Sequence, residues 1–190
     1  MKGIICTIGL LLCACIVLNG QTKINWLSWE EAIELSKDNK KKFFVDVYTN
    51  WCGWCKKMDV ATFQKSHIAQ YVNENYYAVK FNAEQKEEIQ FKEKLYKFVS
   101  QGRRGYHELA AAITKGRLSY PTIVFLDEDL NVIQPIPGFQ DAKSFEQIMT
   151  YFAGNYYQNT PWRKYTQNYV STLEKDAKKV PVKTASKQNK

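Results

Sequence analysis

The chain has 190 residues, which is enough for one domain with a hydrophobic core and short extensions. Hydrophobic residues make up 45% and aromatic residues 14% of the chain, a composition typical of a globular protein and not of a disordered one. Residues 171–190 contain six lysines and two acidic residues, so this tail supplies about half of the formal net charge of +8. No basic, aromatic-rich motif of the RNA-binding kind is present, and we expect no nucleic-acid partner.

Residues 1–20 have the pattern of a targeting segment. Lys2 precedes an almost continuous apolar run over residues 4–18, after which the sequence turns polar. The run is shorter than the ~20 residues of a membrane-spanning helix, so we expect a secretory signal that is cleaved near Gly20 and a periplasmic or otherwise exported protein. Two alternatives remain open: an uncut anchor, and a lipoprotein in which Cys15 is lipidated. Only these alternatives would give the protein a membrane contact.

Signal cleavage would also remove three of the five cysteines, Cys6, Cys13 and Cys15. The mature protein would then retain only Cys52 and Cys55. Because thiols oxidise in exported proteins, we expect this pair to be a disulfide or a redox couple.

Helical and strand patterns alternate after the signal. Ser28 begins a capping box and therefore a helix. Residues 43–48 form a short apolar run, rich in β-branched and aromatic residues, which predicts a central strand buried on both faces. A helix is expected to begin near Cys52, with a second helical stretch from Ser66, and residues 76–81 form the next predicted strand.

Residues 84–119 form an insertion whose structure the pattern leaves open. Apolar residues alternate over residues 89–98, which favours a hairpin, although a helix fits nearly as well. A helix over residues 105–115 is predicted from apolar side chains spaced i, i+3, i+4 and i+7, namely Tyr106, Leu109, Ala110 and Ile113.

The last third of the chain predicts a hairpin and two helices. Residues 121–126 and 131–136 are strands joined by an acidic turn, and an apolar helical stripe follows within residues 145–152. Thr160 and Pro161 predict the start of an extra helix. Its stripe consists of Trp162, Tyr165, Tyr169 and Leu173. This helix could pack back on the domain or face a partner, and we expect disorder after Asp176.

The element order predicts an α/β sandwich with a mixed sheet flanked by helices. We place the domain at residues 21–155, with the insertion at about 84–119. Residues 156–190 form the extra helix and the basic tail.

Cys52 and Cys55 are three residues apart at the start of a predicted helix. Residues i and i+3 share a helix face, so the two sulfurs can come within bonding distance. At the first turn, unpaired N–H groups and the helix dipole favour a thiolate, which would lower the pKa of Cys52. Cys52 is therefore the predicted nucleophile. Cys55, one turn further along and more buried, is the predicted resolving thiol.

Two other interpretations of the cysteine pair were open. A structural disulfide would close a very small loop and would therefore stabilise the fold little. A zinc site needs four ligands, and His67 and His107 are poor support because we expect both to be solvated or core residues without a catalytic partner. A Cys-x-x-Cys pair near a βαβ pattern favours redox chemistry.

The stretch from Val45 to Lys56, VDVYTNWCGWCK, resembles the active-site segment of thioredoxin, including its strand and turn. Residues 78–82 are similar to the next strand of that family. Residues 120–122, Tyr-Pro-Thr, resemble its cis-proline loop, and Gly138 lies where the family has a glycine before its last helix.

The resemblance covers roughly residues 26–152 and extends to secreted bacterial thioredoxin-like proteins with a W-C-x-W-C-K-K-M-type motif. Two features depart from thioredoxin itself. Trp54 replaces the usual proline, and the segment 84–119 is longer than in the family.

The resemblance implies roles for further residues. Asp46, a carboxylate within an apolar strand, would lie behind Cys55 and relay its proton, with Lys80 as its neighbour; such a buried carboxylate should be paired or protonated. Pro121 would be cis and face the cysteines, and the Tyr120 backbone would pair with an extended substrate. Trp51 is expected to pack under the loop and Trp54 to be an exposed docking residue. Arg103 and Arg104 would be a solvated loop or a basic lip near the site.

We therefore expect an exported thiol–disulfide oxidoreductase without a cofactor or metal. Its partners would be protein thiols and disulfides and an electron donor, and the thioredoxin likeness favours a reductase. The alternative is a binding module on the same scaffold, with a redox-inert disulfide.

Overall fold

The computed structural model describes residues 22–171. The predicted signal segment, Cys15, Leu173 and the predicted disordered tail lie outside the described residues. Among residues 22–171, we find no helix with the length and apolar character needed to cross a membrane.

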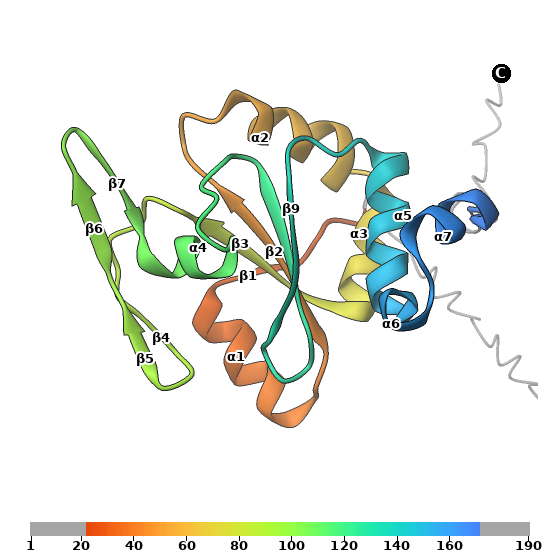
Figure 1. Cartoon of the computed structure of the whole chain (residues 1–190), viewed down its shortest axis with the longest axis horizontal. Coiled ribbons are helices and arrows are strands. Elements are labelled where there is room, and N and C mark those ends of the chain that lie inside the picture. Colours follow the sequence, from red (N-terminus) through yellow and green to blue (C-terminus); the bar gives the residue numbers. More distant parts are fainter. Residues whose placement is uncertain (1–21, 172–190) are drawn as a thin grey trace, which may run out of the picture.

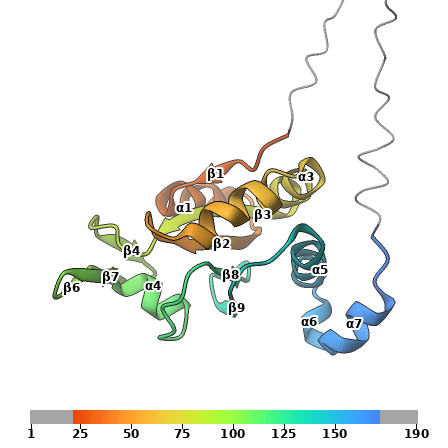
Figure 2. The ribbon, with the colours of Figure 1, turned by 90° about the horizontal axis from the view of Figure 1, so that it is seen from above.

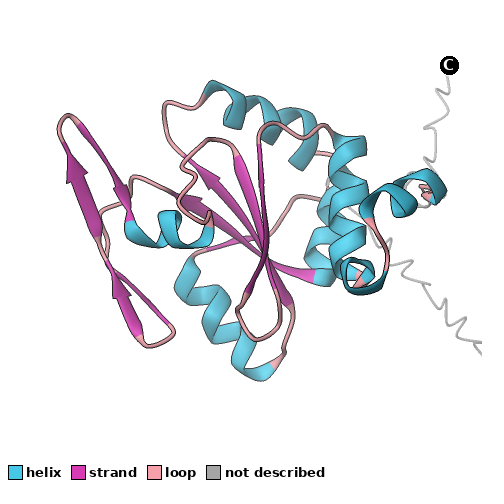
Figure 3. Ribbon diagram, in the orientation of Figure 1, coloured by secondary structure: helices cyan, strands magenta, loops and turns pink. Residues whose placement is uncertain are grey.

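The centre of the molecule is a five-stranded mixed sheet (Figure 1, Figure 3). Its strands, in spatial order, are β1 (Trp26–Leu27), β3 (Tyr76–Asn82), β2 (Lys42–Tyr48), β8 (Thr122–Leu126) and β9 (Val132–Pro137). The β1, β3 and β2 strands are parallel, whereas β2 pairs antiparallel with β8 and β8 with β9. The predicted fold class, a mixed sheet flanked by helices, is confirmed. The short edge strand β1 was not predicted from the sequence.

Helices lie on both faces of this sheet. They are α1 (Trp29–Asp38), α2 (Gly53–Met58), the π-helical turn η1 (Asp59–Phe63), α3 (Ser66–Asn75), α4 (Glu108–Ile113), α5 (Ala142–Ala153), α6 (Tyr156–Asn159) and α7 (Trp162–Asn168). The capping box of α1 is present: Glu31 N–H donates to the Ser28 hydroxyl, and Ser28 N–H donates to the Glu31 carboxylate. The expected helix after residue 52 contains the π-helical turn η1, which the apolar pattern does not indicate.

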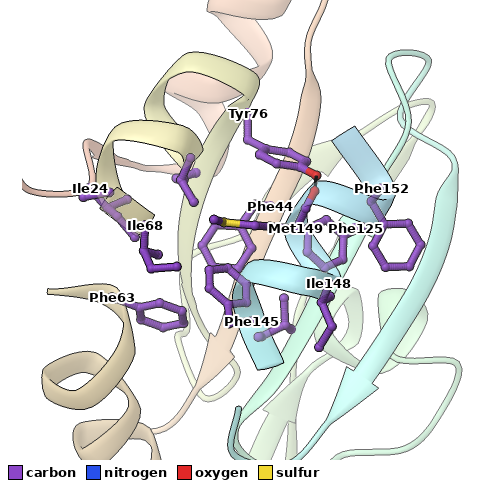
Figure 4. Packing of buried hydrophobic residues seen from close by; sticks show 14 of the residues in the cluster. Ile24, Phe44, Phe63, Ile68, Tyr76, Phe125, Phe145, Ile148, Met149 and Phe152 are labelled. Atoms are coloured by element: carbon purple, nitrogen blue, oxygen red, sulfur yellow. Dashed lines mark hydrogen bonds between the residues drawn. The ribbon is translucent and has the colours of Figure 1, made fainter. Parts of the chain in front are cut away.

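The alternation of side chains along β2 divides the core into two clusters. Phe44 faces α2, η1, α3 and α5, where it contacts the rings of Phe63 and Phe145 (Figure 4). Phe43, Val45 and Val47 face the opposite cluster, beside α1 and α4. Because both faces are covered, apolar residues occupy both faces of β2 and do not alternate with polar ones, Asp46 being the exception within residues 43–48.

The insertion forms two successive hairpins at one end of the sheet. They consist of β4 (Ile89–Phe91) with β5 (Lys94–Tyr96), and of β6 (Phe98–Gln101) with β7 (Arg104–His107). The hairpin alternative for residues 89–98 is thus confirmed for the first pair. The second pair was missed.

The predicted helix over 105–115 begins later than expected, at Glu108. Tyr106 and His107 pair instead with Val99 and Phe98 across the second hairpin. Gly105 permits this close pairing, since a Cβ at that position would lie 2.4 Å from the Val99 carbonyl oxygen. The hydrophobic spacing was correct for Leu109, Ala110 and Ile113, which are all buried.

The C-terminal elements α6 and α7 pack beside α5, at the end of the molecule away from the hairpins (Figure 2). The Tyr165 hydroxyl donates to Thr150 (2.8 Å), and the Tyr169 hydroxyl donates to the buried Glu146 carboxylate (2.7 Å). α7 ends at Asn168, so the expected helical stripe is wrong for Tyr169, which caps the helix in extended conformation.

Candidate active site

The two cysteines lie where β2 ends and α2 begins. Three residues, 49–51, join the strand to Cys52, which is the N-cap residue of α2. Cys52 and Cys55 form a disulfide with their Cα atoms 5.3 Å apart, and the Cys55 backbone N–H donates to the Cys52 Sγ (3.0 Å). Cys52 is 4% exposed and Cys55 is 3% exposed, so the expected difference in burial between them is slight in the disulfide form.

Asp46 is fully buried in the middle of β2. It lies on the same face of the strand as Phe44, two residues before it, and this face is covered by the helix that carries Cys55. Burial raises the pKa of Asp46 from 3.8 to about 6, although the nearby Lys80 ammonium opposes this shift. Lys80 donates to Asp46 Oδ2 (2.6 Å), whereas Oδ1 has no hydrogen-bond partner among the described residues.

Lys80 is the expected neighbour of Asp46, and the parallel register of β2 and β3 places the two directly opposite each other. A second carboxylate, Asp59 of η1, also forms an ion pair with Lys80. Burial lowers the pKa of Lys80, but the two carboxylates more than offset this effect and raise the pKa above its ordinary value. The lysine also lies over the rings of Trp26 (4.8 Å) and Tyr48 (5.2 Å).

Asp59 was not recognised in the sequence. It follows Cys55 by four residues, so a search for polar residues on the cysteine face of the helix would have found it. The π-helical turn that begins at Asp59 changes the helix register from there on. π-helical turns occur frequently at functional sites.

The Tyr120–Pro121 peptide bond is cis, in the loop that enters β8. The Gly138 backbone N–H donates to the Pro121 carbonyl (2.8 Å), and Gly138 adopts the left-handed φ of +91° that glycine accommodates most readily. The Tyr120 backbone makes no hydrogen bond within residues 22–171. These features agree with the resemblance for Pro121, Gly138 and Tyr120, while the substrate-binding role of the loop stays a prediction.

The two tryptophans of the motif are both exposed, Trp51 at 53% and Trp54 at 57%. Exposure was expected for Trp54 but is a correction for Trp51, which does not pack under the loop. The Trp51 indole N–H donates to the Glu84 carboxylate (3.0 Å), and its ring meets the Tyr120 ring edge-on. These contacts hold the Trp51 ring at the surface.

Trp54 lies beside Phe139, with their ring centroids 5.6 Å apart. The Lys57 ammonium lies 4.6 Å from the Trp54 ring centroid. Trp54 is thus held against the loop before α5, and Trp51 against the insertion.

Both histidines are core or partly buried residues, as expected, and each has a hydrogen-bonding or charged neighbour that the sequence does not indicate. His107 is buried and caps α4: its Nδ1 accepts from the Leu109 N–H (3.2 Å), and its Nε2 lies 3.0 Å from the Glu87 carbonyl. Burial lowers the pKa of His107. His67 Nε2 lies 3.8 Å from the Glu146 carboxylate. These are structural positions, and within residues 22–171 no cluster of three or more His, Cys, Asp or Glu side chains could hold a metal ion.

The mixed sheet, the flanking helices and a Cys-x-x-Cys disulfide at a helix start together define a protein of thioredoxin-like fold, in general terms the arrangement of a thiol–disulfide oxidoreductase. The family comparison agrees with this class. The chain belongs to the thioredoxin-like domain family, whose model matches residues 29–153.

Among curated proteins, the chain is 31% identical over 117 residues to the Caenorhabditis elegans "Uncharacterized protein B0495.5", a match that covers 60% of this chain. It is 30% identical over 67 residues to the rat "Spermatogenesis-associated protein 20", covering 35% of this chain. The matches span only 14% and 8% of these longer proteins. A solved thioredoxin from Thermus thermophilus superposes with a TM-score of 0.51 at 14% identity, covering 68% of this chain and 87% of that one.

Proposed function

We propose that this protein is an exported thiol–disulfide oxidoreductase that reduces disulfides in other polypeptides. The observation that supports it most directly is the Cys52–Cys55 disulfide at the start of α2, where the Cys55 N–H is directed at the Cys52 sulfur. In the reduced protein, a donor in this position would stabilise a Cys52 thiolate. Cys52 would therefore be the attacking residue.

The reaction is a two-step exchange. The Cys52 thiolate attacks one sulfur of a substrate disulfide; that S–S bond breaks, the other substrate sulfur leaves as a thiolate, and a mixed disulfide forms. The Cys55 thiol then loses its proton and attacks the Cys52 sulfur, which releases the second substrate thiolate. The substrate gains two electrons, the protein is left with the Cys52–Cys55 disulfide, and a separate dithiol partner must reduce it again.

Asp46 is the proposed acceptor of the Cys55 proton. It lies on the helix-covered face of β2, and one carboxylate oxygen has no other hydrogen-bond partner among the described residues. A pKa of about 6 lets the group accept a proton and release it again near neutral pH. Lys80, paired with both Asp46 and Asp59, would hold the carboxylate in place.

Export is supported by the apolar pattern of residues 4–18, with a soluble periplasmic protein as the simplest outcome and lipid attachment through Cys15 as the alternative. The reductive direction is supported by the likeness to thioredoxin. Neither proposal depends on the other.

The test is insulin reduction with dithiothreitol as the electron donor. The wild-type protein should accelerate precipitation of the insulin B chain, and Cys52→Ser should abolish the acceleration. Cys52→Ser with full reductase activity would refute the assignment. The equilibrium of the Cys52–Cys55 pair against glutathione would then measure the reduction potential and distinguish a reductase from an oxidant.

A redox-inert binding module is the second candidate, and the burial of both cysteines favours it. This module would keep its disulfide with millimolar dithiothreitol at neutral pH, and it would show no thiolate absorbance with a lowered pKa after forced reduction. The oxidoreductase would lose the disulfide and show a Cys52 thiolate well below the ordinary thiol pKa of about 8.5.

A further inference from the structure

The second hairpin of the insertion reaches the active-site loop. The Arg104 guanidinium of β7 lies over the ring of Trp51, 4.7 Å from its centroid, and Trp51 directly precedes Cys52 in the chain. The register of the sheet accounts for this approach. Tyr48 ends β2 opposite Asn82, which ends the parallel strand β3, so the insertion after β3 leaves the sheet at the same edge as the cysteine loop.

The base of the insertion is anchored at that edge. The Ala83 N–H donates to the Tyr48 carbonyl (2.8 Å), and the His107 N–H donates to the Ala83 carbonyl (2.7 Å). The first residue before the insertion is therefore bonded to the strand that leads to Cys52, and the last residue of the second hairpin is bonded to that same residue. These bonds tie the base of the insertion to the edge of the sheet from which the cysteine loop leaves.

A pocket of about 290 Å³ lies on this hairpin, next to Trp51. Its lining includes three cationic side chains, Lys86, Arg103 and Arg104, and one carboxylate, Glu84, together with Phe98. Glu84 already accepts the Trp51 indole N–H. Gly102, at φ +61°, makes the tight turn that places Arg103 at the hairpin tip.

The cations of this pocket have no ion-pair partner among the described residues. Other lysines of the surface, such as Lys40 and Lys97, do pair with carboxylates. Three positive charges against one negative charge leave the pocket with a net charge of +2. The three cationic side chains repel one another, and a bound anion would reduce this repulsion. The pocket therefore attracts acidic partners.

We propose that the pocket formed by Lys86, Arg103 and Arg104 binds an acidic side chain of the polypeptide substrate. The inference rests on the proposed function, and it adds a substrate preference: disulfides with a nearby Asp or Glu are reduced faster than those with a nearby Lys. A polypeptide fits better than a small anion, because the free Tyr120 backbone and the exposed Trp51 ring lie beside the pocket and can contact an extended chain.

The experiment measures kcat/KM of the full chain, reduced by dithiothreitol, on three disulfide peptides that differ only in a Glu, Gln or Lys near the cysteine. At low salt we expect the Glu peptide to exceed the Lys peptide by about tenfold, and high salt to reduce this ratio. The double variant Arg103→Gln/Arg104→Gln should bring the ratio close to one. A matched control is Arg163→Gln/Lys164→Gln on the exposed surface of α7, which removes the same two charges at the other end of the molecule and should retain the ratio.

Two further variants keep the test independent of any damage to the hairpin. Arg104→Lys should retain most of the ratio, and the double reversal Arg103→Glu/Arg104→Glu, which makes the pocket net negative, should favour the Lys peptide. Equal kcat/KM for the Glu and Lys peptides in the wild-type protein would overturn acid recognition while leaving the reductase intact. Failure to reduce any of the three peptides would instead overturn the proposed function, and this inference with it.

Discussion

The two sides of the Cys52–Cys55 disulfide differ in almost every physical respect. On the inner side, the buried Asp46 forms an ion pair with Lys80, whose side chain is 22% exposed. On the outer side, Trp51 and Trp54 are more than half exposed, and each lies under a cation, Arg104 or Lys57. The inner groups can move a proton but cannot touch a partner, and the outer groups can touch a partner but are remote from proton transfer. Inner changes should therefore alter kcat, and outer changes should alter KM and substrate preference.

The largest effect is expected where the two sides meet, at the sulfurs. Cys55→Ser should still attack a substrate disulfide through Cys52 but should not resolve the product, so turnover falls to background. A covalent complex should accumulate that is visible on a non-reducing gel and lost with dithiothreitol. The matched variant Cys52→Ser should form no such complex. Trapping by Cys52→Ser but not by Cys55→Ser would reverse the two roles.

The second largest effect is expected from a change at Asp46, the carboxylate on the inner side. Asp46→Asn should slow resolution of the mixed disulfide by at least about tenfold. This factor is smaller than the usual rate contribution of a positioned general acid or base. In the wild-type protein, the resolution rate should rise as pH passes about 6, because deprotonated Asp46 is the proton acceptor. Stopped-flow tryptophan fluorescence would measure this rate, and the rise should be absent in Asp46→Asn. An unchanged rate and pH profile in the variant would remove Asp46 from the mechanism.

Asp46 should also influence stability. Ionisation of Asp46 is expected to speed resolution of the mixed disulfide but to lower the free energy of unfolding. Its folded pKa of about 6 exceeds the ordinary value of 3.8, so the folded protein binds this proton more tightly than the unfolded chain does. The free energy of unfolding should therefore fall as pH rises from about 4 to about 6. Asp46→Asn should lack this fall and be more stable than the wild type at pH 7, by up to about 3 kcal/mol, since Lys80 keeps Asp59 as a partner. Urea unfolding of the oxidised proteins between pH 4 and pH 8 would test the sign.

The outer side should show smaller effects that depend on the substrate. Trp51→Ala removes the ring that Arg104, Tyr120 and Glu84 hold in place, and we expect kcat/KM on polypeptide disulfides to fall by about tenfold, the loss of one exposed aromatic anchor. Trp54→Ala is the matched variant at the second tryptophan of the motif, whose ring lies against Phe139 and Lys57. Equal losses for acidic and basic peptides are expected from Trp54→Ala. An unequal loss in Trp54→Ala would mean that the charge of the peptide is recognised near Trp54 and not at the Lys86–Arg103–Arg104 pocket.

The sequence predicted the inner side better than the outer one. An apolar run interrupted by one carboxylate is a local signal, and it was enough to predict the buried strand. The pairing of Asp46 with Lys80 was expected from the resemblance to thioredoxin, and the register of β2 and β3 brings it about. The contacts of Trp51 are non-local. They depend on Glu84 and Arg104, which come close only after β2 and β3 have paired in register.

Two further misses have similar causes. The second hairpin contains Gly102, Arg103 and Gly105, so the apolar alternation that indicates strands is weak there, and Tyr106 fitted a helical spacing equally well. The π-helical turn at Asp59 does not disturb the helical spacing of apolar residues in the sequence, so the pattern gives no sign of it. Thr62 and Phe63 of this turn are buried, and the Thr62 hydroxyl donates to the Gln140 carbonyl (2.7 Å), a contact between residues far apart in the chain.

The smallest predicted effect separates charge from geometry on the outer side. Glu84→Gln can still accept the Trp51 indole N–H through its amide oxygen, so the ring should stay in place. The change removes the one carboxylate of the Lys86–Arg103–Arg104 pocket. The preference for a Glu over a Lys peptide should therefore increase by about two- to threefold, as expected for one partly solvated charge. A preference that stays the same or falls in Glu84→Gln would mean that the net charge of this pocket does not select the substrate.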